Sequence, residues 1–214
     1  MAMFGWNAIQ TPPSHNGNVG GEVLPDEFGT EPLRGYRGWH VVNAEPGPGW
    51  ALKSLHVSYL WGRQVEAFCH KQGMMFQPRA HIGSVSPDPA CSCGIYAQLP
   101  EHPLDEWDRA KLGRVSASGT IAMWGRIIQC ERGYKAQYAS IQDPIVIDLS
   151  CLKDCDRDPI VVAIPHHPQL VFNCYCDEHA RSADGHVTVP ADIWLREVSE
   201  RLSQRYDIEV LTWA

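Results

Sequence analysis

The sequence predicts an α+β protein in which a small, mostly antiparallel β unit is followed by a smaller α+β C-terminal part. Three observations lead to this prediction. Short segments of alternating bulky and polar residues fill much of the chain before Ser150, one strongly amphipathic helical segment lies near the C-terminus, and seven of the eight cysteines gather in two sets. With 44% hydrophobic and 20% charged residues, the 214-residue chain has an ordinary globular composition, which excludes wholesale disorder and a fibrous repeat.

Residues 1–35 form the first predicted segment, an extended or poorly ordered arm. Pro, Gly, Asn and Ser are frequent in it, as in TPPSHNGNVGG, and no hydrophobic period is visible. The arm also lacks a basic stretch followed by an apolar run, and nowhere does the chain hold the roughly 18 consecutive apolar residues that a membrane span needs. We therefore expect a cytoplasmic protein without a membrane segment.

Residues 36–149 form the mostly-β unit. YRGWHVVN (36–43) and WALKSLHVSYLW (50–61) flank the turn-forming EPGPG and alternate bulky and polar residues, as strands do. GTIAMWGRIIQC (119–130) and GYKAQYAS (133–140) predict a hairpin, and PIVIDLS (144–150) predicts a further strand. LDEWDRAKLG (104–113) predicts one short helix.

Residues 150–214 form the smaller α+β unit. PIVVAIP (159–165), QLVFNCYC (169–176) and IEVLTW (208–213) predict strands. PADIWLREVSERLSQRY (190–206) predicts the clearest helix in the chain, because Pro190 suits a first helical turn and Leu195, Val198 and Leu202 follow one face.

The eight cysteines favour metal binding over disulfide formation. Without a visible secretory signal we expect a reducing compartment, where thiols bind metals more often than they form disulfides. Two Cys-x-Cys pairs and one Cys-x3-Cys pair suit chelation, because a disulfide inside Cys-x-Cys would close a very small strained ring.

The first candidate metal site consists of Cys69, His81, Cys91 and Cys93, with His70 as a substitute for His81. A structural zinc site takes four N or S ligands in a tetrahedron, and Gly94 lets the backbone turn tightly after the chelating pair. The spacing Cys-x11-His-x9-Cys-x-Cys differs from that of a standard zinc finger. Buried thiols without a metal therefore stay an alternative.

The second candidate metal site consists of Cys151, Cys155, Cys174 and Cys176, with His166, His167 and His179 as alternative ligands. Two close thiolate pairs separated by one β excursion predict a zinc-ribbon-like arrangement. Reduced cysteines without metal and disulfides are the other interpretations. Cys130 belongs to neither site and is expected in the core.

The net charge of −7 disfavours non-specific nucleic-acid binding, whose affinity comes mainly from neutralising phosphates. The chain has no Walker-type loop and no dinucleotide fingerprint, and the SASG segment around Ser118 lacks the pattern of a nucleophile elbow. No catalytic residue is therefore predicted.

Several of these motifs occur together in one family. GWHVVN (38–43), Cys69 and His81 followed by CSCGIYA (91–97), WG (124–125) and GYKA (133–136) give the chain a pattern that resembles a family of small, uncharacterised actinobacterial and actinobacteriophage proteins. The resemblance covers about residues 36–140 and implies that the first candidate metal site acts as one unit. It implies nothing about residues 150–214.

We therefore expect a zinc-stabilised, non-enzymatic binding protein that is phage-encoded, holds one or two structural zinc ions, and acts on a host protein or nucleoprotein. A metal-dependent hydrolase is the first alternative, in which a site with His166, His167 or His179 near a carboxylate keeps an open position for water. A sequence-specific nucleic-acid-binding zinc module is the second.

Overall fold

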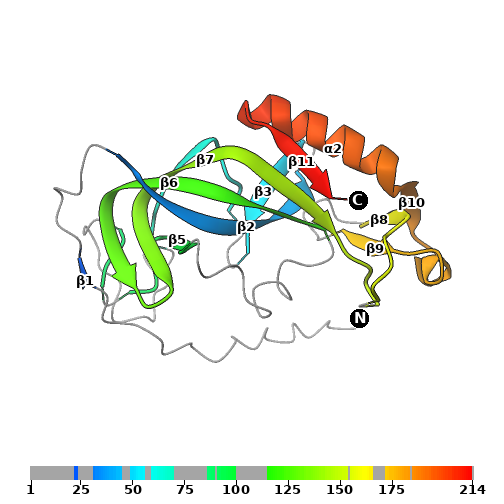
Figure 1. Cartoon of the computed structure of the whole chain (residues 1–214), viewed down its shortest axis with the longest axis horizontal. Helices are drawn as coiled ribbons and strands as arrows, with labels where there is room; N and C mark the ends of the chain where they lie inside the picture. Colours follow the sequence, from blue (N-terminus) through cyan, green and yellow to red (C-terminus); the bar gives the residue numbers. More distant parts are fainter. Residues whose placement is uncertain are drawn as a thin grey trace, which may run out of the picture.

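A computed structural model describes ten stretches of the chain: residues 22–23, 31–44, 49–55, 59–69, 86–89, 91–99, 115–153, 155–165, 172–183 and 185–213. Most of the predicted arm (1–35) and the predicted helix at 104–113 lie outside these stretches. The described residues form a mixed α+β protein dominated by strands, with one α-helix, which confirms the α+β class predicted from the sequence (Figure 1).

The longest element is the antiparallel hairpin of β6 (Val115–Cys130) and β7 (Gly133–Leu149), which confirms the predicted hairpin and extends it in both directions. Its register shifts between Gly119 and Ile121 and again between Trp124 and Ile127. Such irregularities increase bending and twist, and Figure 1 shows both strands curling strongly toward the hairpin turn.

The remaining strands of this sheet are β1 (Glu22–Val23), β2 (Leu33–Asn43), β3 (Trp50–Ser54), β4 (Gln64–Glu66) and β5 (Ile95–Gln98). β2 pairs with β6 on one side and with β3 on the other, and a bridge between Lys53 and Leu60 carries the ladder toward β4. β5 pairs with both β2 and β7, β4 also pairs with β7, and β7 pairs with β6, so the strand pairings return to their start. The sheet therefore closes on itself like a small barrel.

The C-terminal elements form a second layer. β8 (Val161–Ile164), β9 (Asn173–Tyr175) and β10 (Val187–Pro190) make a three-stranded sheet in the order β10-β8-β9, and a short 3-10 helix, η2 (Ala180–Ala183), follows β9. Helix α2 (Ala191–Tyr206) confirms the predicted helix, with Pro190 directly before it. No helix among the described residues is long and apolar enough to cross a bilayer.

The last strand, β11 (Val210–Trp213), joins the two predicted units. It pairs in parallel with β7, so that Val210 lies opposite Ile145, and it ends the large sheet. α2 precedes it and lies against β3 and β11 (Figure 1), and Trp194, Leu195, Val198, Leu202 and Tyr206 of the helix are buried. The pairing of β11 with β7 connects the elements of residues 150–214 to those of residues 36–149.

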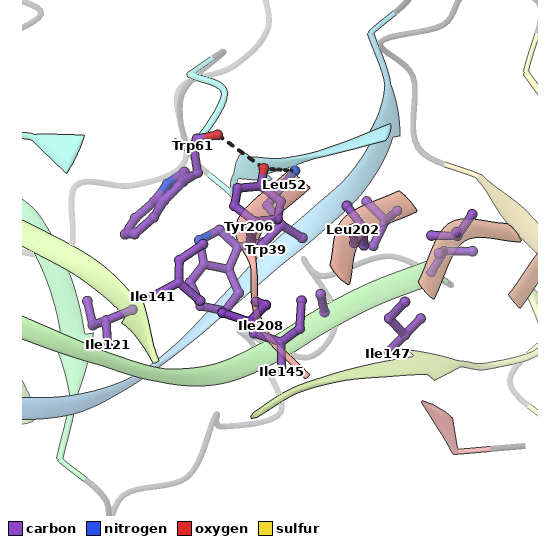
Figure 2. Packing of buried hydrophobic residues seen from close by; sticks show 14 of the residues in the cluster. Trp39, Leu52, Trp61, Ile121, Ile141, Ile145, Ile147, Leu202, Tyr206 and Ile208 are labelled. Carbon is purple, nitrogen blue, oxygen red and sulfur yellow. Dashed lines mark hydrogen bonds between the residues drawn. The ribbon is translucent and has the colours of Figure 1, made fainter. Parts of the chain in front are cut away.

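The main hydrophobic core lies beneath α2 (Figure 2). Trp39, Leu52 and Trp61 of the barrel meet Leu202 and Tyr206 of α2, and all five side chains are buried. The rings of Trp39 and Trp61 pack edge to face with their centroids 5.3 Å apart. Full burial of each such side chain contributes about 1.5–3 kcal/mol, so this junction is a major source of stability.

Two candidate metal centres

The C-terminal part of the chain brings four metal-ligating side chains together, namely Cys151, Cys155, Cys176 and His179; we call them the ribbon cluster. Their ligand atoms all lie within 4.8 Å of one another. Cys151 and Cys155 follow the end of β7, and Cys176 follows β9. A tight turn, in which the amide of His179 donates to the carbonyl oxygen of Cys176 at 3.2 Å, returns the imidazole to the three thiols.

The ring nitrogen of His179 lies close to all three sulfur atoms of this set. His179 Nδ1 lies 3.2 Å from the Sγ of Cys176, 3.5 Å from that of Cys151 and 3.6 Å from that of Cys155. The sulfur atoms of Cys155 and Cys176 are 3.5 Å apart. Three thiols and one ring nitrogen that converge at these distances could hold a metal ion.

The thiols of the ribbon cluster differ in acidity. Burial alone would raise the pKa of Cys151, but hydrogen bonds from the backbone amides of Cys176 and Lys153 and from neighbouring side chains lower it to about 6. The pKa of Cys155 rises to about 11, because its backbone hydrogen bond from Arg157 is outweighed by burial and by the neighbouring thiols. Of Cys151 and Cys155, Cys151 is thus the first to become a thiolate.

An exposed ion-pair network connects the two loops that carry the ligands of the ribbon cluster. The guanidinium group of Arg157 pairs with the carboxylates of Asp177 at 3.3 Å and Glu178 at 2.5 Å. Arg157 follows Cys155 by two residues, and the two acids separate Cys176 from His179. The network therefore ties together the two loops that carry the ligands, although exposed pairs contribute little stability individually.

Cys174 lies outside the ribbon cluster, although the sequence grouped it with Cys151, Cys155 and Cys176. It occupies the middle of β9, opposite Val162, and its side chain is 0% exposed within the main core. Burial, with smaller contributions from Cys151 and Asp148, raises its pKa to about 12, so its thiol keeps its proton. The alternative ligands His166 and His167 lie outside the described residues.

A second group, which we call the loop cluster, consists of Cys69, Cys91 and Cys93. Their sulfur atoms lie within 4.8 Å of one another, all three side chains are buried, and the Sγ atoms of Cys69 and Cys91 are 3.8 Å apart. Cys69 comes shortly after β4, while Cys91 and Cys93 precede β5. These three thiols could also hold a metal ion. The predicted fourth ligand, His81, and its substitute, His70, lie outside the described residues.

The loop that carries Cys91 and Cys93 is shaped by Gly94. Its φ of 125° is a conformation that residues with a side chain rarely adopt. A Cβ atom at this position would also stand 2.9 Å from the Cβ of Pro87 and 3.1 Å from that of Lys135. Both the backbone angle and the available space therefore require glycine after the chelating pair.

Two functional candidates were missed or ranked too low in the sequence. His179 was only an alternative ligand, although Cys176-x2-His179 has the short spacing of ligand pairs in zinc sites. Lys135 was part of a motif without a role, yet its ammonium group reaches the loop cluster. No local signal distinguishes this lysine from one that faces solvent. All eight cysteines are free thiols, and Cys130 lies in neither cluster; it is half-buried, so the prediction that it lies in the core is wrong.

Comparison of the chain with protein-family models, with curated proteins and with solved structures found no match. The resemblance to small actinobacterial and actinobacteriophage proteins stays a prediction. The case for function therefore depends on the two clusters themselves.

Proposed function

We propose that the chain is a zinc-stabilised, non-enzymatic protein that acts by binding a host protein or nucleoprotein. Two zinc ions would fix loops that the barrel does not order, one in the ribbon cluster and one in the loop cluster. The observation that carries this proposal is the convergence of Cys151, Cys155, Cys176 and His179 on one point. In this proposal the C-terminal part is a zinc-ribbon-like module.

The distances support zinc as the metal. With Zn–S bonds of about 2.3 Å and Zn–N bonds of about 2.0 Å, a tetrahedron separates two sulfurs by about 3.8 Å and a sulfur from a nitrogen by about 3.5 Å. The Sγ atoms of Cys155 and Cys176 are 3.5 Å apart, those of Cys69 and Cys91 are 3.8 Å apart, and the three sulfur atoms of the ribbon cluster lie 3.2–3.6 Å from His179 Nδ1. Soft thiolates with one imidazole suit Zn²⁺ better than Mg²⁺ or Ca²⁺.

The donor set of the ribbon cluster favours a structural role over the hydrolase alternative. Three sulfurs and one nitrogen fill a tetrahedral site, whereas a catalytic zinc keeps one position for water or substrate. The carboxylates of Asp177 and Glu178, which lie between Cys176 and His179 in the sequence, pair with Arg157 at the surface. The net charge of −7 likewise argues against the nucleic-acid-binding alternative.

Exposed aromatic side chains beside the loop cluster support partner binding. Phe68, directly before Cys69, is 46% exposed, and Tyr96, three residues after Cys93, is 43% exposed. The Tyr96 hydroxyl donates to the carbonyl oxygen of Ser92 at 3.1 Å, which fixes the ring against the cysteine loop. Aromatic residues in such positions are enriched in protein interfaces. We propose that they contact the partner in the cytoplasm of a bacterial host.

Metal analysis of the reduced protein tests the zinc proposal. We expect two zinc ions per chain by elemental analysis. On removal of zinc by a chelator, amide hydrogen exchange should accelerate in residues 86–99 and 151–183, whereas the β6–β7 hairpin should stay protected. A reduced, folded protein without any bound zinc would overturn the proposal.

Affinity capture from an actinobacterial lysate tests the binding role. The wild-type protein should retain a partner that F68S/Y96S loses, with I193S as a matched control, because Ile193 is also exposed but lies on α2. Equal capture by all three proteins would show that Phe68 and Tyr96 do not bind the partner. Turnover of a substrate that depends on the bound zinc would instead favour the hydrolase.

A further inference from the structure

We infer that Lys135 is a positioning residue of the loop cluster, which fastens the cysteine-bearing turn and supplies the counter-charge for an anionic metal–thiolate centre. The inference rests on the proposed function, since it requires a metal at Cys69, Cys91 and Cys93. The inference adds Lys135 to the residues of the site, although it is not a metal ligand. It also predicts that the metal–thiolate centre has a negative net charge.

The first support is the way in which the ammonium group holds the turn. Lys135 Nζ donates to the carbonyl oxygens of Asp88 and Cys91, each at 2.9 Å. The same carbonyl oxygen of Asp88 accepts a hydrogen bond from the amide of Cys91 at 3.1 Å, which closes the turn. One side chain from β7 therefore holds both ends of the turn that begins the Cys-x-Cys pair.

The second support is the burial of the lysine stem. The Lys135 side chain is 1% exposed, and it packs against Gly94, which lies between it and Pro87. Lys135 stands opposite Ile128 on β6 and Tyr96 on β5, so rigid strands flank it on both sides. The ammonium group is thus held at the cluster by a well-packed side chain.

The third support is charge. The two carbonyl oxygens satisfy two of the three N–H groups of the ammonium, but they are neutral and leave its positive charge uncompensated. A buried charge is costly unless an opposite charge lies near it. Three thiolates around a divalent ion, with a neutral fourth ligand, carry a net charge of −1. Such a centre beside Cys91 compensates the lysine, whereas three neutral thiols do not.

Substitution of Lys135 in the full-length protein tests the inference. Lys135→Met removes the charge and both hydrogen bonds but keeps the apolar stem, whereas Lys135→Arg keeps the charge. We expect Lys135→Met to weaken zinc binding by the loop cluster roughly 10- to 100-fold, the range typical of groups that orient metal ligands. Lys135→Arg should recover part of this loss, and the ribbon cluster should keep its affinity in both variants.

The two centres can be followed separately by loading the protein with ¹¹³Cd, which gives one NMR signal per site, and then titrating with a chelator. Lys53→Met serves as the matched control, because Lys53 is a half-buried lysine of the same barrel that belongs to neither cluster. The inference is overturned if Lys135→Met folds and its loop cluster keeps the wild-type affinity, or if Lys135→Arg loses as much affinity as Lys135→Met.

A measurement on the wild-type protein covers the case in which Lys135→Met does not fold. The ammonium signal of Lys135 in ¹H–¹⁵N spectra should be protected from exchange in the metal-loaded protein and should shift or broaden when the loop cluster is stripped. A signal that does not respond to metal would overturn the inference alone. A wild-type protein that takes up no metal at either cluster would overturn the proposed function as well.

Discussion

The hydroxyl group of Tyr206, in the last turn of α2, donates a hydrogen bond to the carbonyl oxygen of Trp61 at 3.1 Å. It also accepts one from the amide of Leu52 at 2.9 Å. Figure 2 shows the hydroxyl between these two backbone groups, at the point where the ladder passes from β3 toward β4. One buried side chain thus fastens the C-terminal helix to the barrel where no regular strand closes it.

Removal of this hydroxyl should destabilise the whole fold. We expect Tyr206→Phe to lower the free energy of unfolding by about 1–3 kcal/mol, because it leaves a buried amide and a buried carbonyl without their partner. Urea denaturation measures the change, and Tyr134→Phe, which alters a half-buried tyrosine of β7, is the control. Equal stability of the two variants would show that the hydroxyl does not fasten the helix.

The same hydroxyl predicts a loss of stability in alkali. Burial raises the pKa of Tyr206, partly opposed by the hydrogen bond from Leu52 and by Arg205. The folded protein therefore keeps this proton at pH values where the unfolded chain has lost it, so the free energy of unfolding should fall as the pH rises above about 10. Denaturation series at neutral and alkaline pH should show a smaller decline for Tyr206→Phe than for the wild type. Identical declines would contradict the assignment.

The distinction between Cys174 and His179 can be tested directly. We expect His179→Ala to lose one zinc ion per chain, because it removes one of the four converging ligands. Cys174→Ala should keep both ions and lose about 1 kcal/mol of stability for the buried atoms removed. Elemental analysis and urea denaturation of both variants give the answer. Loss of zinc from Cys174→Ala with retention in His179→Ala would restore the four-cysteine set predicted from the sequence.

Gly94 and Gly185 form a matched pair for the loop cluster. Both have a positive φ, 125° and 87°, but a Cβ at Gly94 would meet Pro87 and Lys135, whereas a Cβ at Gly185 would meet nothing within 4 Å. Gly185→Ala should therefore cost only the backbone strain, roughly 1–2 kcal/mol. Gly94→Ala should cost about 1–3 kcal/mol more and weaken metal binding by the loop cluster. Similar unfolding free energies and zinc contents in the two variants would contradict this account.

Local sequence patterns predicted the elements of this protein better than their pairing. The alternation on either side of Glu131 and Arg132 predicted the β6–β7 hairpin, and the spacing of Leu195, Val198 and Leu202 predicted α2. The closure of the barrel and the parallel pairing of Val210 with Ile145 were not predicted, because they join segments far apart in the chain. A period of two residues indicates a strand but not its neighbour.

The candidate site shows the same limit. The sequence predicted that the cysteines gather in two sets, and the structure brings three predicted cysteines together in each. The sequence did not predict that Cys174 faces the core. Its strand has only three residues, and so short an alternation does not show which side chains point inward. Lys135 likewise looks like an outward lysine in an alternating strand. In the folded protein, Asp88, Cys91 and Gly94 lie against it, and it is buried.

The parallel pairing of β11 with β7 also has a consequence for biosynthesis. Val210 and Ile145 are 65 positions apart, and the ribbon cluster and α2 lie between them. The β6–β7 hairpin therefore leaves the ribosome before α2 and β11 have been translated. Until then, the edge of β7 that pairs with β11 and the apolar side that α2 covers are exposed. Open strand edges and bare apolar surfaces promote association between nascent chains. The yield of folded protein in a cell should thus depend on translation speed between residues 150 and 213, and on chaperones that shield β7 until its last neighbour arrives.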